Sequence, residues 1–285
     1  MSGSGLTLSV TLAVLGAGLL HAGWNALLKR AQGGDPMLDT AAVVIGSAVW
    51  SVIALPFAGL PDPAAWKFMA VSSLVHFAYY VTLSNAYRTG DLSFAYPVMR
   101  GSAPLLTALL GIVFLRELPP LHVAVGIVLI CAGIVSIAFV RREKHPPEAL
   151  RWALANAAII ATYTLIDGAG VRASGNSLAY VSWLLALEGL PYLAWLFWSR
   201  GGGTVTRYVA RSGRLAVVGG FGSLAAYAIV LWAMTQAPVA AVAALRETSV
   251  LFAALIGAVW LKEGFGMMRL VGAASVVAGI AALKL

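Results

Sequence analysis

Long apolar runs alternate with short polar segments along the chain. Ten runs are mostly apolar, and about 20 residues of helix suffice to cross a hydrocarbon core of about 30 Å. The runs lack the strict alternation of apolar and polar residues that is typical of a membrane β-barrel. The pattern predicts an all-α integral membrane protein with ten transmembrane helices, at approximately 5–28, 37–57, 65–87, 92–115, 119–140, 149–171, 177–198, 211–235, 239–261 and 265–284.

Composition agrees with a membrane protein. Of the 285 residues, 60% are hydrophobic and 11% are charged, whereas about 25% of a soluble domain is charged. Basic residues outnumber acidic ones by 19 to 11, but they lie singly or in short clusters between the apolar runs. Charges so placed indicate membrane loops rather than a nucleic-acid surface. We therefore expect the lipid bilayer, and not nucleic acid, as a partner.

The two halves of the chain repeat one pattern. When the sequence is shifted by 146 positions, charges and glycines coincide in the same order, with the pairs Arg100 and Arg246, Glu117 and Glu263, Gly126 and Gly272, and Gly133 and Gly279. This register predicts a first five-helix repeat at 1–146 and a second at 147–285, which together form one transporter domain. Because five is odd, the second repeat would enter the membrane from the opposite side. Inverted repeats of this kind are typical of transporters with a midplane site.

Three segments resemble one transporter family. They are HAGWNALLKR at the end of the first run, AYRTGDLSFAYPVMRGSAPLL across the third and fourth runs, and the two glutamates Glu117 and Glu263. The chain resembles the EamA-like branch of the drug/metabolite transporter superfamily over nearly its whole length. This resemblance implies a small-molecule solute and a multi-pass protein of the bacterial inner membrane. We also expect no cofactor or metal, and a monomer or weak homodimer.

The resemblance departs from the small multidrug members at one point. Those members use a carboxylate in their first span for proton coupling, whereas the first run here offers His21, Trp24 and Asn25.

Charged residues inside the runs are the candidates for function. An arginine near the bilayer centre costs from about 2.5 to more than 10 kcal/mol, so it must face a partner or a polar chamber. Arg100 continues a polar stripe at helical spacing, and the third and sixth runs carry similar stripes. We expect a solute-binding chamber lined by His21, Trp24, Asn25, His76, Tyr79, Tyr80, Tyr96, Arg100, Tyr163, Asp167 and Arg246, with Glu188 and Glu247 as coupling or structural charges.

Several of these residues allow a structural interpretation as well. Arg100 and Arg246 could bind helix-end carbonyls, or pair with a carboxylate such as Asp167 or Glu247, instead of a solute. Glu117 and Glu263 are typical of helix caps at the ends of spans. His76 could pack against aromatic rings or carry a proton.

The sequence favours a secondary transporter. Arginine can bind a carboxylate with two hydrogen bonds, and an aromatic face can bind an ammonium group, so we expect an amino acid exporter with alternating access through a central cavity. Uptake or exchange of a phosphorylated or phosphonate anion is the alternative. An integral-membrane enzyme is the alternative of another class, but the chain lacks HExxH and GxSxG and is predicted not to be an enzyme. It also lacks the ATP-binding motif GxxxxGK[ST].

Basic residues and the family resemblance predict opposite orientations of the chain in the membrane. Outside the runs, four basic residues fall on the face that carries both chain ends and thirteen on the other, which predicts that the second face is cytoplasmic. The family resemblance implies the reverse.

Overall fold

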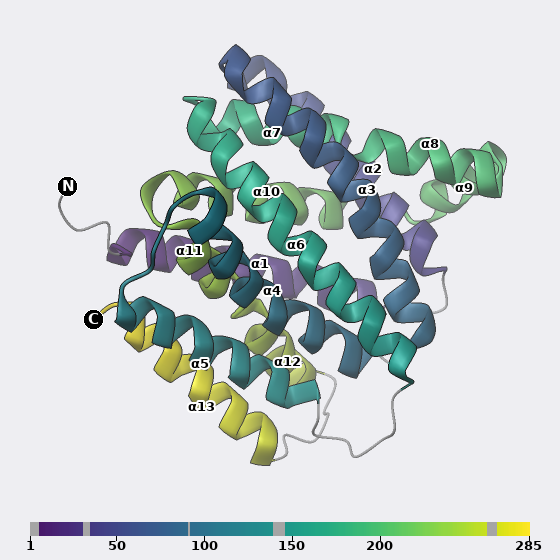
Figure 1. Cartoon of the computed structure of the whole chain (residues 1–285). Coiled ribbons are helices and arrows are strands. Elements are labelled where there is room, and N and C mark those ends of the chain that lie inside the picture. The colour runs from purple at the N-terminus through teal and green to yellow at the C-terminus, as the bar shows by residue number, and fades with distance from the viewer. Residues whose placement is uncertain (1–5, 31–34, 91, 139–145, 261–266) are drawn as a thin grey trace.

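The computed structural model describes residues 6–30, 35–90, 92–138, 146–260 and 267–285, and every regular element among them is a helix (Figure 1). The elements are α1 (Leu8–Arg30), α2 (Pro36–Ala58), η1 (Pro63–Ala65), α3 (Trp66–Thr89), α4 (Leu92–Phe114), α5 (Leu121–Ala138), α6 (Pro147–Ala173), α7 (Ser177–Leu187), α8 (Gly189–Arg200), α9 (Gly202–Arg211), η2 (Leu215–Gly219), α10 (Gly220–Gln236), α11 (Val239–Arg246), α12 (Ser249–Trp260) and α13 (Met267–Ala282).

The predicted apolar runs coincide with helices, but two of them are interrupted. In the seventh run α7 ends and α8 begins at Glu188, which itself keeps helical torsion angles (φ −61°, ψ −29°). Pro191 lies in the first turn of α8 and has no N–H, so it cannot donate to the helix there. The ninth run is divided after Arg246, where the amide groups of Glu247 and Thr248 donate to carbonyls three residues earlier. Each interruption places a glutamate inside the protein.

Residues 202–211 form the helix α9, although the glycine-rich sequence predicts a loop there. Val205, Tyr208 and Val209 lie on one side of α9 at helical spacing and pack toward α2. The Tyr208 hydroxyl donates to Asp39 Oδ1 at 2.7 Å. Burial and this hydrogen bond raise the pKa of Tyr208 to about 12, so its hydroxyl remains a donor at neutral pH. Tertiary contact with α2 therefore stabilises a helix that local propensity does not favour.

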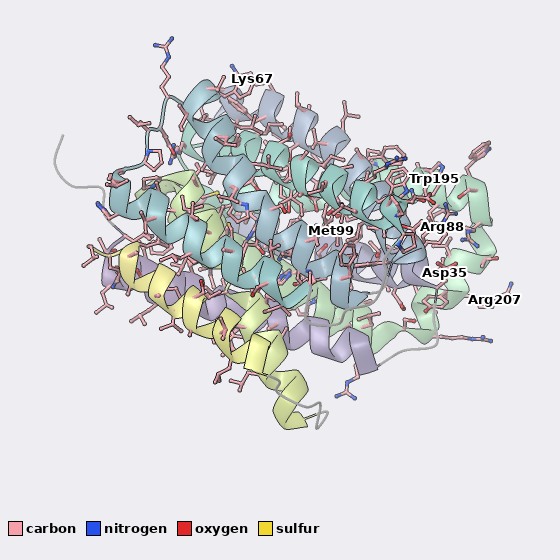
Figure 2. All side chains as sticks on the ribbon, turned by 60° about the horizontal axis from the view of Figure 1, so that its bottom comes forward. Asp35, Lys67, Arg88, Met99, Trp195 and Arg207 are labelled. Carbon is pink, nitrogen blue, oxygen red and sulfur yellow. The ribbon has the colours of Figure 1, made fainter. Side chains whose placement is uncertain are left out.

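The molecule has the surface of a membrane protein. Six helical stretches in the described residues are long and apolar enough to cross a bilayer. Large apolar side chains such as Phe57, Val113 and Trp198 are mostly exposed, which lipid accommodates and water does not. Figure 2 shows Lys67 at one end of the molecule and Arg88 at the other, with Met99 between them. Charged side chains thus lie near both ends of α3.

The helices α5 and α13 lie side by side on one face (Figure 1). A Cβ atom on Gly133 would lie 2.6 Å from the carbonyl oxygen of Gly272, and one on Gly272 would lie 2.7 Å from that of Gly133. Gly126 and Gly279 approach each other in the same way, at 2.8 Å in both directions. The two backbones are in direct contact, which glycine permits because it has no side chain.

The helices that carry the candidate site converge in the interior. Helix α4 packs against α5, α6 and α11, α3 packs against α6 and α8, and α1 packs against α10 and α12. Figure 1 shows α4 and α6 crossing the middle of the molecule. Polar side chains on these helices are therefore brought together away from lipid.

Candidate functional site

One buried cluster joins two arginines to a single carboxylate. Glu247 Oε2 lies 2.9 Å from Arg100 Nε, and Glu247 Oε1 accepts from Arg246 Nε and Nη2 at 3.1 and 3.0 Å. Glu247 is 0% exposed and the arginines are buried too. Arg100 Nη2 also donates to His21 Nε2 at 2.9 Å. Because an acceptor nitrogen carries no proton, His21 is neutral in this arrangement.

The helix interruption after α11 explains this geometry. Arg246 is the last residue of α11 and Glu247 follows it, while Arg100 comes from the middle of α4. Among the residues that the structure describes, Glu247 is the carboxylate that ion-pairs with either arginine. Two guanidinium groups and one carboxylate leave one positive charge in a buried place. Such a cluster favours a negatively charged group as a further partner.

A second buried cluster surrounds Glu188. Its Oε1 accepts from the Tyr80 hydroxyl at 3.1 Å, and its Oε2 lies 3.4 Å from His76 Nε2. The other ring nitrogen of His76 lies 3.0 Å from the carbonyl oxygen of Ser72 and 3.1 Å from its hydroxyl. Glu188 comes from the interruption between α7 and α8, whereas the other three residues come from α3.

Asp167 on α6 is a further buried acceptor. The Tyr180 hydroxyl donates to its Oδ1 at 3.0 Å, and the Tyr227 hydroxyl donates to its Oδ2 at 2.5 Å. Asp167 is fully buried, and two hydroxyl donors compensate part of the cost of removing a carboxylate from water.

Aromatic rings connect the clusters. The Tyr163 ring lies 4.3 Å from the His76 ring and 5.7 Å from the Tyr79 ring, measured between centroids. On the other side, the guanidinium carbon of Arg100 lies 5.7 Å from the centroid of Tyr96. These contacts place ring faces beside charged groups, an arrangement that can bind cations.

The structure brings most of the predicted site residues into these clusters. The cluster at Glu247 contains His21, Tyr96, Arg100 and Arg246, and the groups around His76 and Asp167 contain Tyr79, Tyr80, Tyr163 and Glu188. The side chains of Trp24 and Asn25 lie outside the described part of the chain. Two carboxylates were candidate partners for the arginines. In the structure the arginines pair with Glu247, whereas Asp167 accepts hydrogen bonds from tyrosines.

Sequence reasoning missed Ser72, Tyr180 and Tyr227. A signal for the tyrosines existed, because a carboxylate in the middle of an apolar span requires hydrogen-bond donors from neighbouring spans. Tyr180 and Tyr227 are polar positions within such spans. Their pairing with Asp167 depends on helix packing, which the sequence pattern does not specify.

Glu117 serves as a helix cap, as one interpretation of the sequence predicts. Its Oε2 accepts from the backbone N–H of Val239 at 3.0 Å, at the start of α11, and its Oε1 pairs with Arg172. Arg172 in turn donates to the carbonyl oxygens of Met234 and Ala237 at 2.7 and 3.0 Å. The counterpart, Glu263, lies outside the described residues.

The fold and the buried charges define a helical, multi-pass membrane protein. The sequence model of the EamA-like transporter family matches residues 8–139 and, separately, residues 148–285. The chain belongs to the EamA-like transporter family, within the drug/metabolite transporter superfamily, which confirms the resemblance seen in its sequence. Membership implies a small-molecule solute.

A solved crystal structure of a protein shares the fold. It is 18% identical to this chain, with a TM-score of 0.76, and the match covers 96% of each chain. Nothing among the curated proteins matches the chain.

Proposed function

We propose that this chain is a secondary transporter of the bacterial inner membrane that exports an amino acid by alternating access. In this proposal ten spans form two inverted five-helix repeats, 1–146 and 147–285, around a central solute cavity. The interrupted pairs α7/α8 and α11/α12 each count as one span, and α9 lies outside the spans.

Symmetric contacts support the inverted repeats. The two glycine pairs between α5 and α13 exchange places under the 146-residue shift. Ser275 Oγ donates to the carbonyl oxygen of Leu129 at 2.8 Å, and these two positions are 146 residues apart. A residue that contacts its own equivalent lies next to a twofold axis. The two separate matches to the family model, one in each half, support the same division.

The main support for the proposed solute is that Arg100 and Arg246 share one carboxylate, that of Glu247. The net positive charge at Arg100, Arg246 and Glu247 favours binding of the solute carboxylate. The rings of Tyr79, Tyr96 and Tyr163 would bind the solute ammonium group or an aromatic side chain. Together these groups suit a zwitterion whose two ends need different partners.

A phosphorylated or phosphonate anion is the second candidate, because the same two guanidinium groups would bind it. An integral-membrane enzyme has less support, because the family is one of transporters.

Counterflow in liposomes separates the two solute classes. Purified protein is reconstituted with a high internal concentration of an unlabelled solute, and entry of the labelled solute is measured. We expect exchange with amino acids and not with phosphorylated solutes. Lack of exchange with every amino acid would reject the amino acid exporter, and exchange with phosphate esters would establish the alternative.

The variant Arg246→Gln tests the site itself. Removal of this guanidinium leaves Glu247 paired with Arg100, so the protein should fold while the solute loses a charged partner. Loss of such a hydrogen bond predicts about 10- to 100-fold weaker solute binding in the counterflow assay. The exposed Arg207→Gln on α9 is the matched control and should bind as the unmodified protein does. Equal affinity of Arg246→Gln would remove Arg246 from the site.

A further inference from the structure

The two nitrogens of His76 have different roles in the structure. Nδ1 lies 3.0 Å from the backbone carbonyl oxygen of Ser72, which can only accept. In the tautomer that donates to this carbonyl, Nδ1 carries the hydrogen, and the Ser72 hydroxyl, 3.1 Å away, is its second polar neighbour. In a neutral imidazole the other nitrogen, Nε2, then has a lone pair and no proton.

That lone pair faces a carboxylate. Glu188 Oε2 lies 3.4 Å from His76 Nε2 and accepts no hydrogen bond from the described residues. The second carboxylate oxygen already accepts from Tyr80. Two buried acceptors face each other unless a proton resides on one of them, and leaving both unprotonated has a high cost in a dry interior. The geometry requires one proton at this pair.

The other groups near the pair are neutral tyrosines and one further carboxylate. From α3, Tyr79 and Tyr80 face His76, and from α6, Tyr163 stacks on its ring. Asp167 on α6 accepts from Tyr180 of α7 and Tyr227 of α10. On α2, Val44 packs against Gly189, the residue after Glu188.

The pair joins elements from different halves of the chain. His76 lies on α3, and Glu188 lies at the interruption between α7 and α8. Movement of α3 against the α7/α8 pair would change the separation of the two residues. A proton that is held only while both acceptors are close becomes exchangeable when they separate.

We propose that His76 and Glu188 form a proton-binding site that couples solute movement to a proton gradient. The inference rests on the proposed transport function. When the pair opens toward one side, the shared proton passes to water there and leaves a carboxylate and a neutral imidazole. A proton from the other side restores the pair after the opposite opening. The coupling is therefore one proton per cycle.

A pH gradient across proteoliposomes tests the coupling. Counterflow at equal pH on both sides first identifies a transported amino acid, and its net uptake is then measured with and without the gradient. We expect the unmodified protein to accumulate the solute only with the gradient. Normal counterflow without any response to the gradient would overturn the proton inference. Absence of counterflow would reject the proposed function instead, so the two failures are distinguishable.

Glu188→Gln is the decisive variant. The side-chain amide can accept from Tyr80 and donate to His76 Nε2, so it satisfies the same contacts without an exchangeable proton. We expect exchange to persist to a measurable extent and the response to the gradient to disappear. Glu148→Gln, at an exposed position on α6, is the control and should respond like the unmodified protein. A full gradient response in Glu188→Gln would exclude this site.

Proton sharing between His76 and Glu188 can also be measured without transport, which matters if Glu188→Gln is inactive. The chain has four histidines, so ¹⁵N-histidine NMR spectra can be assigned by comparison with a His76→Gln sample. We expect His76 Nδ1 to remain protonated and the Nε2 signal to change with pH in the unmodified protein, but not in Glu188→Gln. The same pH response in both proteins would show that no proton is shared.

Discussion

The carboxylate of Glu117 contacts the start of α11 and, through Arg172, the end of α10. It accepts from the first N–H of α11 and pairs with Arg172, which satisfies carbonyl groups at the end of α10. Both side chains are only partly exposed, at 24% and 33%. A pair with this exposure stabilises less than a fully buried one. Its hydrogen bonds to helix ends, however, would be left without partners if it were removed.

Glu117→Gln should therefore lower stability without removing the solute site. An unsatisfied partner costs about 1–3 kcal/mol, and partial exposure places the loss near the lower end. In a protein of this size we expect a melting temperature lower by about 2–6 °C in detergent. Arg172→Met should give a similar loss, and the double variant should lose less than the sum of the two. Additive losses would show that the pair does not act as a unit.

The positions of the buried charged residues could be predicted from the sequence, but not all of their partners. Arg100 required a counter-charge because of its place in an apolar run, and that narrowed the choice to Asp167 or Glu247. The selection of Glu247 depends on the helix interruption after Arg246, which turns two sequence neighbours toward one centre. Hydrophobic periodicity contains no information on such a turn.

Helix positions could be predicted at the scale of elements, since about 20 apolar residues leave few alternatives in a membrane. Interruptions within spans and the helix α9 could not be located in the same way. Pro191 indicates a broken hydrogen bond in the seventh run, but the division after Arg246 has no proline within it. α9 depends on contacts with α2 that exist only in the folded protein.

Gly133→Ala should disrupt the contact between α5 and α13. The added carbon would lie 2.6 Å from the carbonyl oxygen of Gly272, and the two backbones would have to separate. We expect a lower melting temperature and a smaller monodisperse fraction after purification. Gly16→Ala on α1 is the control, because a Cβ there meets nothing within 4 Å. This variant should be neutral or gain up to about 1 kcal/mol from helix propensity.

Charge distribution at the scale of the whole molecule gives a prediction of orientation. In the predicted ten-span topology, one face has the segment 141–144 and the exposed residues Arg207, Arg211 and Arg214, and with them the excess of positive charge. We expect that face to be cytoplasmic because cytoplasmic loops retain basic residues. Single cysteines in the segment 141–147, in a background with Cys131 replaced, should react only with membrane-permeant reagents in intact cells.

If an impermeant reagent labels the same positions, this face lies outside the cell. That is the orientation that the family resemblance implies. A cysteine at the exposed Leu60 is the matched control, because the predicted topology puts the loop after the second span on the face opposite to 141–147; it should show the complementary pattern in either case.

The backbone contact between α5 and α13 limits which parts can move during transport. At the four glycines the backbones of the two helices approach each other directly, and side chains such as Val276 and Leu283 pack beside them, so sliding would cause steric overlap. We therefore expect α5 and α13 to keep a fixed position relative to each other while other helices move. Spin labels on α5 and α13 should keep a constant separation in the inward and outward states, while labels on α3 and α8 change theirs.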